Sequence, residues 1–375
     1  MKKEIEIFSK FVFSDIEKIV KEFKIKNPEG GILFLITEKE KSKIKKLQQI
    51  FNKYKLSLIG AVFPQLIEND NFLENGALLI KFNKMPYYCI QNDLSEEEIE
   101  YDFQMRELSE NIKKNIHSSK NYTLFLIFDA FVSKIASMLS ELYVLLADIV
   151  NYAGANAGSE TFKQIDCIFS INKIYKNALL AVLLEDNSEC VLEHGYKAPE
   201  KKVVATATQK NEIISINWQS AFTAYSNILF ENFNIKINSS NFYKYAVHFP
   251  FGIIKADGQI IVRIPVSLKK EKSIFCVGEI KENSLLTVLE APKENSYKTI
   301  KSMSKQLKSK NEIMLFYCAG RKMHFNDSSK KELSEFRNLL KKNKIYGVLS
   351  LGEIGQIKNT RLPELHNGAI LCINI

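Results

Sequence analysis

Arginine is scarce in this basic protein. Its 375 residues include 52 Lys+Arg and 43 Asp+Glu, for a net charge of +9, yet only five of the basic residues are arginine. Surfaces that bind nucleic acids usually gather Lys and Arg on one face, whereas lysines here are scattered through nearly every polar segment. The composition therefore predicts no nucleic-acid partner.

The chain also lacks a Cys-x-x-Cys pair and any uninterrupted apolar run of membrane-spanning length. Its six cysteines stand apart, and some, such as Cys372, lie inside apolar runs. This pattern is typical of buried thiols in a reducing compartment, not of a disulfide framework or a zinc site. Charged residues such as Asp129 and Glu141 interrupt the longest apolar stretch, residues 124–150, and the N-terminus is too acidic for a signal peptide. These absences predict a cytoplasmic protein with no membrane span, metal or other cofactor.

Apolar runs of strand length alternate with helical patterns along the chain. Residues 32–36 form a continuous apolar run typical of a buried strand, and apolar residues recur at helical spacing between Ile44 and Tyr54. Hairpins are predicted over residues 77–90 and 167–184, so the sheets should be mixed. The predicted fold class is α/β (α+β), with two mixed β-sheet domains flanked by helices in a layered sandwich.

The length predicts about two domains, and the density of apolar residues falls around residues 196–202. We therefore predict domains at 1–198 and 199–375. The two halves share a rough order of elements that ends in glycine-bearing loops, at Gly154–Gly158 and Gly352–Gly355, without a repeat at the level of residues. No predicted helix follows Gly154–Gly158 directly, so this loop does not indicate a phosphate-binding site.

The segment Cys318-Ala319-Gly320-Arg321 follows a predicted strand at 312–316. A thiol beside an arginine can act as a nucleophile, because the cation lowers the pKa of the thiol. The base that such a nucleophile needs would be His324 or His366. Contact with a ligand and simple packing are the other interpretations of Cys318.

Glu353 stands between glycines directly after a buried strand. Because glycines let a backbone approach closely, this carboxylate either forms a structural pair with Arg321 or Arg263, or receives the ammonium or hydroxyl groups of a ligand. Further polar candidates lie at the edges of predicted elements. They are His248, Glu279, His366 and Asn367.

Taken together, these motifs resemble the FIST family (F-box and intracellular signal transduction domains). The segments similar to its C-terminal half are Cys318–Arg321, Gly352–Gly355, His366–Asn367, His248–Pro250 with Arg263, and Gln219–Ala221 leading to Tyr225. Gly154–Gly158 and His194–Tyr196 are similar to its N-terminal half. Two segments depart from the family pattern, Gly60–Gln65 and Ser159–Glu160, so we expect the site in the C-terminal half or between the halves.

The resemblance implies a sensory domain that binds a small polar ligand, such as an amino acid. Other members join this domain to kinases, cyclases, chemotaxis modules or an F-box, so we expect this chain to signal through a separate partner protein. An amino acid would offer its carboxylate to Arg321 and its ammonium to Glu353, with Arg263 and Glu279 as a second such pair. His248, Cys318, His366 and Asn367 would line the pocket. The alternatives are a cysteine-dependent hydrolase or acyltransferase using Cys318, and a scaffold in a signalling or motility complex.

Overall fold

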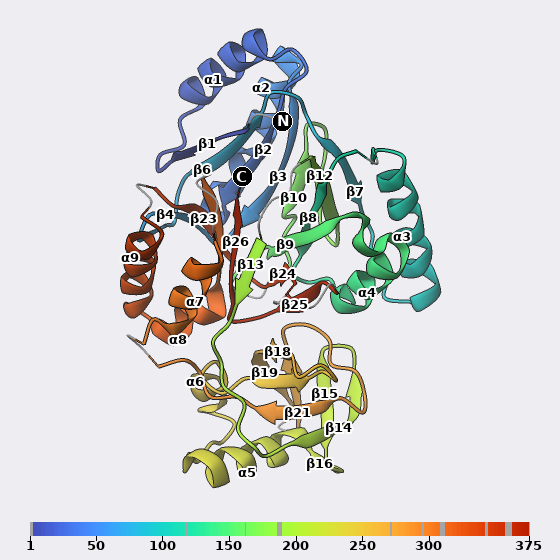
Figure 1. Ribbon diagram of the computed structural model, residues 1–375, viewed down its shortest axis with the longest axis vertical. Coiled ribbons are helices and arrows are strands. Elements are labelled where there is room, and N and C mark those ends of the chain that lie inside the picture. The colour runs from blue at the N-terminus through green and yellow to red at the C-terminus, as the bar shows by residue number, and fades with distance from the viewer. Residues whose placement is uncertain are drawn as a thin grey trace.

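The computed structural model describes residues 3–117, 119–161, 163–185, 190–270, 272–293, 296–307, 312–341, 344–356 and 362–374. It consists of a body of three six-stranded sheets and a smaller lobe with an antiparallel sheet, which lies below the body in Figure 1. The chain enters the lobe after β13 (Cys190–Glu193) and leaves it after β21 (Leu285–Val288). The predicted α/β (α+β) class, with mixed sheets flanked by helices, is confirmed.

The body repeats one order of elements three times: strand, helix, strand, helix, strand, hairpin, strand. The first unit consists of β1 (Lys3–Phe8), α1 (Phe13–Lys26), β2 (Gly31–Thr37), η1 (Glu38–Lys43), α2 (Ile44–Tyr54), β3 (Ser57–Phe63), β4 (Gln65–Glu68), β5 (Asn71–Leu73) and β6 (Ala77–Phe82). The second consists of β7 (Tyr87–Gln91), α3 (Glu98–Lys113), β8 (Tyr122–Asp129), α4 (Ile135–Leu146), η2 (Ala147–Ile149), β9 (Asn151–Ala157), β10 (Ile168–Ser170), β11 (Ile174–Tyr175) and β12 (Leu179–Glu185). The third consists of β13, the inserted lobe, α7 (Lys298–Gln306), β22 (Ile313–Cys318), α8 (Ala319–Phe325), α9 (Ser328–Leu340), β23 (Tyr346–Ser350), β24 (Glu353–Gly355), β25 (Glu364–His366) and β26 (Ile370–Asn374).

The hairpins exchange partners between the units. Each sheet centres on one parallel pair, formed by β2 and β3, by β8 and β9, or by β22 and β23. The hairpin β4–β5 extends the sheet of β23, β10–β11 extends that of β3, and β24–β25 extends that of β9. Both predicted hairpins are therefore wrong, because β6 and β7, like β10 and β12, lie in different sheets.

A glycine occupies the same register position in the second parallel strand of each unit. A Cβ atom at that position would lie 2.1–2.2 Å from a backbone oxygen of the first strand, and the pairs are Gly60 with Phe34, Gly154 with Leu126 and Gly347 with Leu315. Gly154 thus belongs to strand β9, and the prediction of a loop there is wrong. The insertion of the lobe makes the spacing of these glycines irregular, which hides the repeat in the sequence.

The three sheets enclose a shared apolar core, and helices cover their outer faces (Figure 1). Leu33, Ile127 and Phe316, one from each sheet, belong to this core. The rings of Phe125 and Phe316 lie 5.6 Å apart and join the second sheet to the third. Outside, α3 and α4 pack on the second sheet, and α7 and α9 pack on the third.

The lobe has its own core, to which Tyr225 and Phe251 belong. Its elements are β14 (Val203–Gln209), β15 (Glu212–Ile216), β16 (Gln219–Ser220), α5 (Ala221–Phe233), α6 (Phe242–Ala246), β17 (Phe251–Ile254), β18 (Ile260–Arg263), β19 (Pro265–Lys269), β20 (Ser273–Cys276) and β21. The predicted boundary between residues 198 and 199 lies where the chain enters the lobe. Residues 298–374 then return to the body, so the range 199–375 contains the lobe and most of the third unit.

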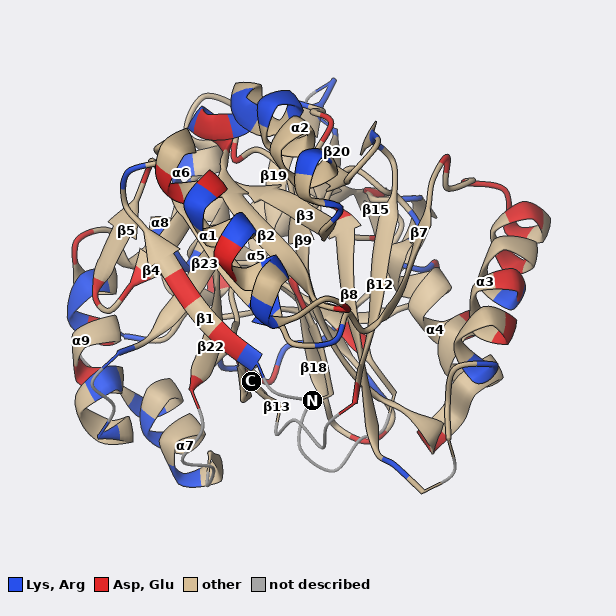
Figure 2. Ribbon diagram, turned by 90° about the horizontal axis from the view of Figure 1, so that it is seen from above, with Lys and Arg blue, Asp and Glu red and all other residues tan. Residues whose placement is uncertain are grey.

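In the view of Figure 2, acidic and basic residues occur together on α1, α3 and α9, whereas the charged residues of α2 and α7 are all lysine. None of the described helices is long and apolar enough to cross a membrane.

Substitution of Gly347 by alanine should destabilise the body, because the new methyl group would collide with the Leu315 backbone oxygen. We expect the free energy of unfolding to fall by about 1–3 kcal/mol, measured by chemical denaturation. Gly355→Ala is the matched control, since the atoms nearest to its Cβ would be side-chain atoms of Leu192 and Leu371, at 3.1–3.5 Å, and not a backbone oxygen. Equal stability of the two variants would contradict the close approach of β22 and β23.

Candidate functional site

A cavity of about 250 Å³ lies between the body and the lobe. The body lines it beyond the carboxyl ends of parallel strands, with Ala130, Phe131, Ser159, Cys318, Ala319 and Leu351. The lobe supplies Tyr243, Val247, Ile264, Val266, Phe275 and Val277. Since ligands of α/β proteins commonly bind outside the carboxyl ends of parallel strands, this cavity is the candidate site.

The walls of the cavity are mainly apolar, and its charged groups lie at the mouth. Phe131, Tyr243 and Met323 line the cavity and remain 38–40% exposed, so these large side chains lie at its opening beside the charged groups. Glu96 of the body forms an ion pair with Lys210 of the lobe across this opening. The cavity therefore suits a molecule with an apolar part inside and polar groups at the rim.

Cys318 lines the cavity where β22 passes into α8. Its Sγ accepts a hydrogen bond from the Gly368 N–H at 3.0 Å and further ones from the backbone N–H groups of Gly320 and Arg321. Burial raises the pKa of the Cys318 thiol, and the nearby Glu353 carboxyl raises it further. The backbone donors act in the opposite direction by stabilising a thiolate.

Glu353 is fully buried at the start of β24, next to Cys318. Its carboxyl accepts hydrogen bonds from Ser350 Oγ at 2.6 Å, from the Ala369 N–H at 3.3 Å, and from the Cys318 thiol. Burial nevertheless raises the pKa of Glu353 to about 8. Glu353 is thus a buried carboxyl group with a raised pKa, in contact with a thiol.

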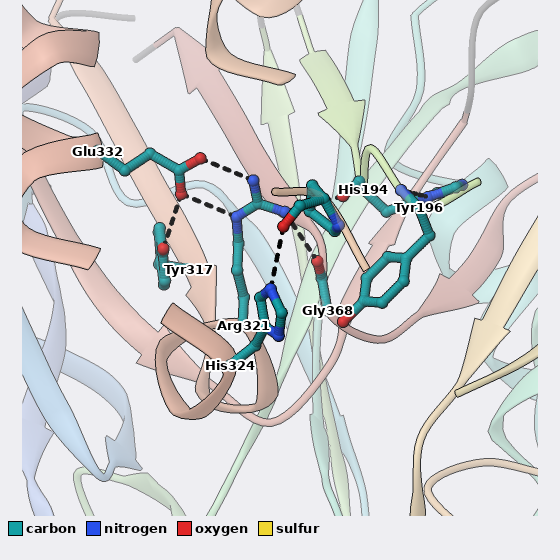
Figure 3. Close-up of polar contacts among 8 residues, drawn as sticks. His194, Tyr196, Tyr317, Arg321, His324, Glu332 and Gly368 are labelled. Atoms are coloured by element: carbon teal, nitrogen blue, oxygen red, sulfur yellow. Dashed lines mark hydrogen bonds and ion pairs between the residues drawn. The ribbon is translucent and has the colours of Figure 1, made fainter. Parts of the chain in front are cut away.

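Arg321 lies away from the cavity lining, with its guanidinium held by protein groups (Figure 3). Its Nε and Nη2 donate to the two carboxylate oxygens of Glu332 at 2.9 and 2.7 Å. Its Nη1 donates to the carbonyl oxygens of His194 and Gly368, at 2.8 and 3.3 Å, and the Tyr317 hydroxyl also donates to Glu332. This buried bidentate pair joins α8 to α9, so the structural partner of Arg321 is Glu332 and not Glu353.

Arg263 and Glu279 lie at the seam between the lobe and the body. Arg263 is buried and donates to the carbonyl oxygens of Glu279 and Leu365, at 3.0 and 2.7 Å. Burial lowers the pKa of Arg263. The Glu279 carboxylate accepts bonds from the N–H and hydroxyl of Ser137, at 3.1 and 2.7 Å, in the first turn of α4. A carboxylate is stabilised at that end of a helix, so both residues hold the lobe against the body.

The two histidines that were candidate bases for Cys318 have other neighbours. His324 lies on α8 with its Nδ1 2.6 Å from the Nδ1 of His248 and its Nε2 3.0 Å from the Pro292 carbonyl oxygen. His366 stacks on His194 with ring centroids 6.3 Å apart. Burial lowers the pKa of His366 well below its usual range, and neither ring nitrogen has a hydrogen-bond partner among the described residues. The acid–base group placed against the thiol is Glu353.

Asn367, a candidate pocket residue from the sequence, lines the cavity, and its Oδ1 accepts the Ile264 N–H at 3.2 Å. The structure thus places Cys318 and Asn367 in the cavity lining and Glu353 in contact with Cys318, and it places the predicted arginines, Glu279 and the predicted histidines in structural contacts.

Sequence reasoning missed Asn211, which lines the cavity from the lobe. Asn211 is 8% exposed, and its Oδ1 has no hydrogen-bond partner within the described part of the chain. It lies in a short turn between β14 and β15, so no pattern marks it in the sequence.

Substitution of Arg321 by leucine should destabilise the protein, because it leaves the buried Glu332 carboxylate without its cation. Breaking one partner of such a pair costs about 3–5 kcal/mol, and the double variant Arg321→Leu/Glu332→Leu should recover much of this loss. Urea denaturation of the three proteins measures the effect. A single variant as stable as wild type would contradict a structural role for Arg321.

Comparison with protein families matches a model described as the FIST N domain over residues 31–219 and one described as the FIST C domain over residues 221–356. No curated protein matches the chain. The two matches meet at the end of β16, inside the lobe, and together they span both body and lobe. FIST domains are sensory domains of signal transduction, and the resemblance seen in the sequence motifs is confirmed. This chain belongs to the FIST family.

Proposed function

We propose that this protein is a sensor that binds a small ligand in the cavity between body and lobe and signals through a separate partner protein. One observation carries this proposal: body and lobe line the cavity jointly. A ligand in this position contacts both parts at once, and its binding energy then depends on how they are placed.

The proposed ligand is an amino acid with an apolar side chain. The apolar walls would receive that side chain, and burying one of leucine size contributes about 1.5–3 kcal/mol. The carboxylate and ammonium would remain at the mouth, near Lys210 and Glu160, which line the cavity. Arg321 and Arg263 donate their hydrogen bonds to protein groups. We therefore propose Lys210 and Glu160, in place of these arginines, as the polar contacts of the ligand.

The proposed relay is a change in how the lobe sits on the body. Polar contacts cross this seam, including the bonds from Ser137 to Glu279 and the ion pair of Glu96 with Lys210. A ligand shifts such an equilibrium only as far as it binds one arrangement better than the other. The partner would read the arrangement that the bound ligand favours.

The ligand class is testable by thermal shift with the amino acids one at a time. We expect leucine, isoleucine, methionine and phenylalanine to raise the melting temperature, because their side chains match the apolar walls. Aspartate and lysine should have no effect, because their charges would be buried without partners. Absence of any shift across all amino acids would contradict an amino-acid ligand.

The cavity itself is testable by filling it. Val266→Trp should abolish the shift because Val266 lines the cavity. Val144→Trp is the matched control, since Val144 is 74% exposed on α4. Retention of the full shift in Val266→Trp would place the ligand elsewhere.

The relay predicts that a bound ligand slows amide hydrogen exchange in α6 and β19 of the lobe and at residues 130–133 of the body, which all contribute to the cavity lining. Helix α1, on the opposite side of the body in Figure 1, is the internal control. Protection confined to the body would contradict a signal carried by the lobe.

A further inference from the structure

The three units of the body place different side chains at one equivalent position. At the end of the first parallel strand, where the chain turns away from the sheet, stand Thr37, Asp129 and Cys318. Their backbone N–H groups bond to the corresponding carbonyl oxygens in the approach to β6, β12 and β26, those of Gly76, Ala178 and Ala369. Cys318 therefore occupies the position that holds a carboxyl group in the second unit.

The surroundings of Asp129 and Cys318 match in their hydrogen-bond donors. Asp129 accepts the N–H of the residue two further along, Phe131, at 3.0 Å, and that of Asn177, before β12, at 2.7 Å. Cys318 accepts the N–H of Gly320, also two residues further along, and that of Gly368, before β26. The two carboxylate oxygens of Asp129 and the Sγ of Cys318 thus meet equivalent backbone donors, and at Cys318 these donors oppose the burial and the Glu353 charge that raise the pKa of the thiol.

Each of these positions also pairs a thiol with a carboxyl group. In the second unit the Asp129 carboxyl contacts the Cys167 thiol, and in the third the Cys318 thiol contacts Glu353. The two pairs differ in access. Cys167 is fully buried and does not line the cavity, whereas Cys318 does.

An independent feature of the same cavity indicates a polar group on the occupant. The Asn211 carboxamide lines the cavity, is more than nine-tenths buried, and has an oxygen with no protein partner among the described residues. Buried polar groups are normally hydrogen-bonded. The free oxygen of this carboxamide accepts hydrogen bonds, so it can bind an N–H or O–H group of a small ligand.

We propose that Cys318 captures small α,β-unsaturated carbonyl compounds that carry an N–H or O–H donor, covalently in this cavity, with Glu353 as the acceptor of the thiol proton. The proposal rests on the proposed function only in using the same cavity as its binding site. A thiolate is the nucleophilic form of cysteine, and the apolar walls select neutral reagents.

The reaction is a conjugate addition, in which no group leaves and no oxidant or reductant takes part. The Cys318 proton passes to the Glu353 carboxylate as Sγ forms a bond to the β-carbon. The carbon–carbon π bond breaks, its electron pair is delocalised onto the carbonyl oxygen as an enolate, and the proton on Glu353 is then delivered to the α-carbon. The reverse elimination restores the thiol and the free ligand.

The carboxyl must be ionised before it can accept the proton. Because burial raises the pKa of Glu353 to about 8, capture should be slow at pH 6 and accelerate as the pH rises through 8. Two other groups face this pair. Arg321 lowers the pKa of Glu353, and Tyr196, whose own pKa burial raises, remains neutral throughout this range.

The test uses the full chain with acrylamide, an unsaturated carboxamide with an N–H donor, followed by intact-mass analysis and peptide mapping. We expect a single adduct of the reagent mass on Cys318, faster than any adduct on the half-buried surface residue Cys89, and none on Cys167. Saturated propionamide, of nearly the same shape, should leave the mass unchanged. An unmodified Cys318, or faster labelling of Cys89 or of the other cavity thiol, Cys276, would overturn the proposal.

Two variants separate the role of Glu353 from simple access to the thiol. Glu353→Gln should slow labelling by about 100-fold, the lower limit for loss of a general base, whereas Cys276→Ser should label as fast as wild type. A folded Glu353→Gln protein that labels at the wild-type rate would remove the carboxyl from the mechanism. Because this variant could lose stability, its melting curve is recorded in parallel, and the site selectivity in wild type decides the proposal independently.

The outcome is distinguishable from that of the proposed function. An amino acid that raises the melting temperature and slows labelling shows that both ligands use the cavity. Labelling of Cys318 without any change of melting temperature by amino acids would support covalent capture and contradict amino-acid sensing. A change of melting temperature without labelling would support amino-acid sensing and contradict covalent capture.

Discussion

Strand pairing between units is the constraint on which the rest of this structure depends. The sheet of each unit is completed by a hairpin from a neighbouring unit, so none of the units has a complete sheet by itself. The exchange encloses one core between the inner faces of the sheets. It also brings the ends of β8, β9, β22 and β23 to the lobe, where the turns after these strands line the cavity. The site is therefore a consequence of how the sheets close around the core.

The charged residues buried near that cavity are paired or hydrogen-bonded within the protein. Arg321 and Arg263 are both buried, and their donors are taken by Glu332 and by backbone carbonyl oxygens. Removing a charge from water is costly unless it is paired and hydrogen-bonded, so these arginines serve cohesion between elements. The polar groups that line the cavity include the thiols of Cys318 and Cys276, the carboxamides of Asn211 and Asn367, and the charged residues Glu96, Glu160 and Lys210. The proposed ligand, with an apolar part and a polar end, matches this lining.

The second and third units differ in the side chain at the end of their first parallel strand. The second unit fills the strand-end position with Asp129, which is sealed against Cys167. The third unit uses Cys318 at the equivalent position, beside Glu353, and the lobe inserted in this unit forms the opposite wall of the cavity. The fold thus places a carboxyl group at this position in the second unit and a thiol that lines the cavity at the equivalent position in the third.

The sequence by itself determined the class of fold, many of the strands and helices, and the residues at which function was sought. Continuous apolar runs mark buried strands such as β2, and helical spacing marks α2, because local periodicity follows from burial on one or both faces. Cys318, Glu353 and Asn367 were identified from short motifs near strand ends.

Only the tertiary structure decided which residues meet. The exchange of hairpins, the pairing of Arg321 with Glu332 and the place of Asn211 in the cavity join positions far apart in the chain or on separate elements. Such contacts depend on long-range pairing and on the competition among buried polar groups for partners. Neither leaves a periodic signal in the sequence.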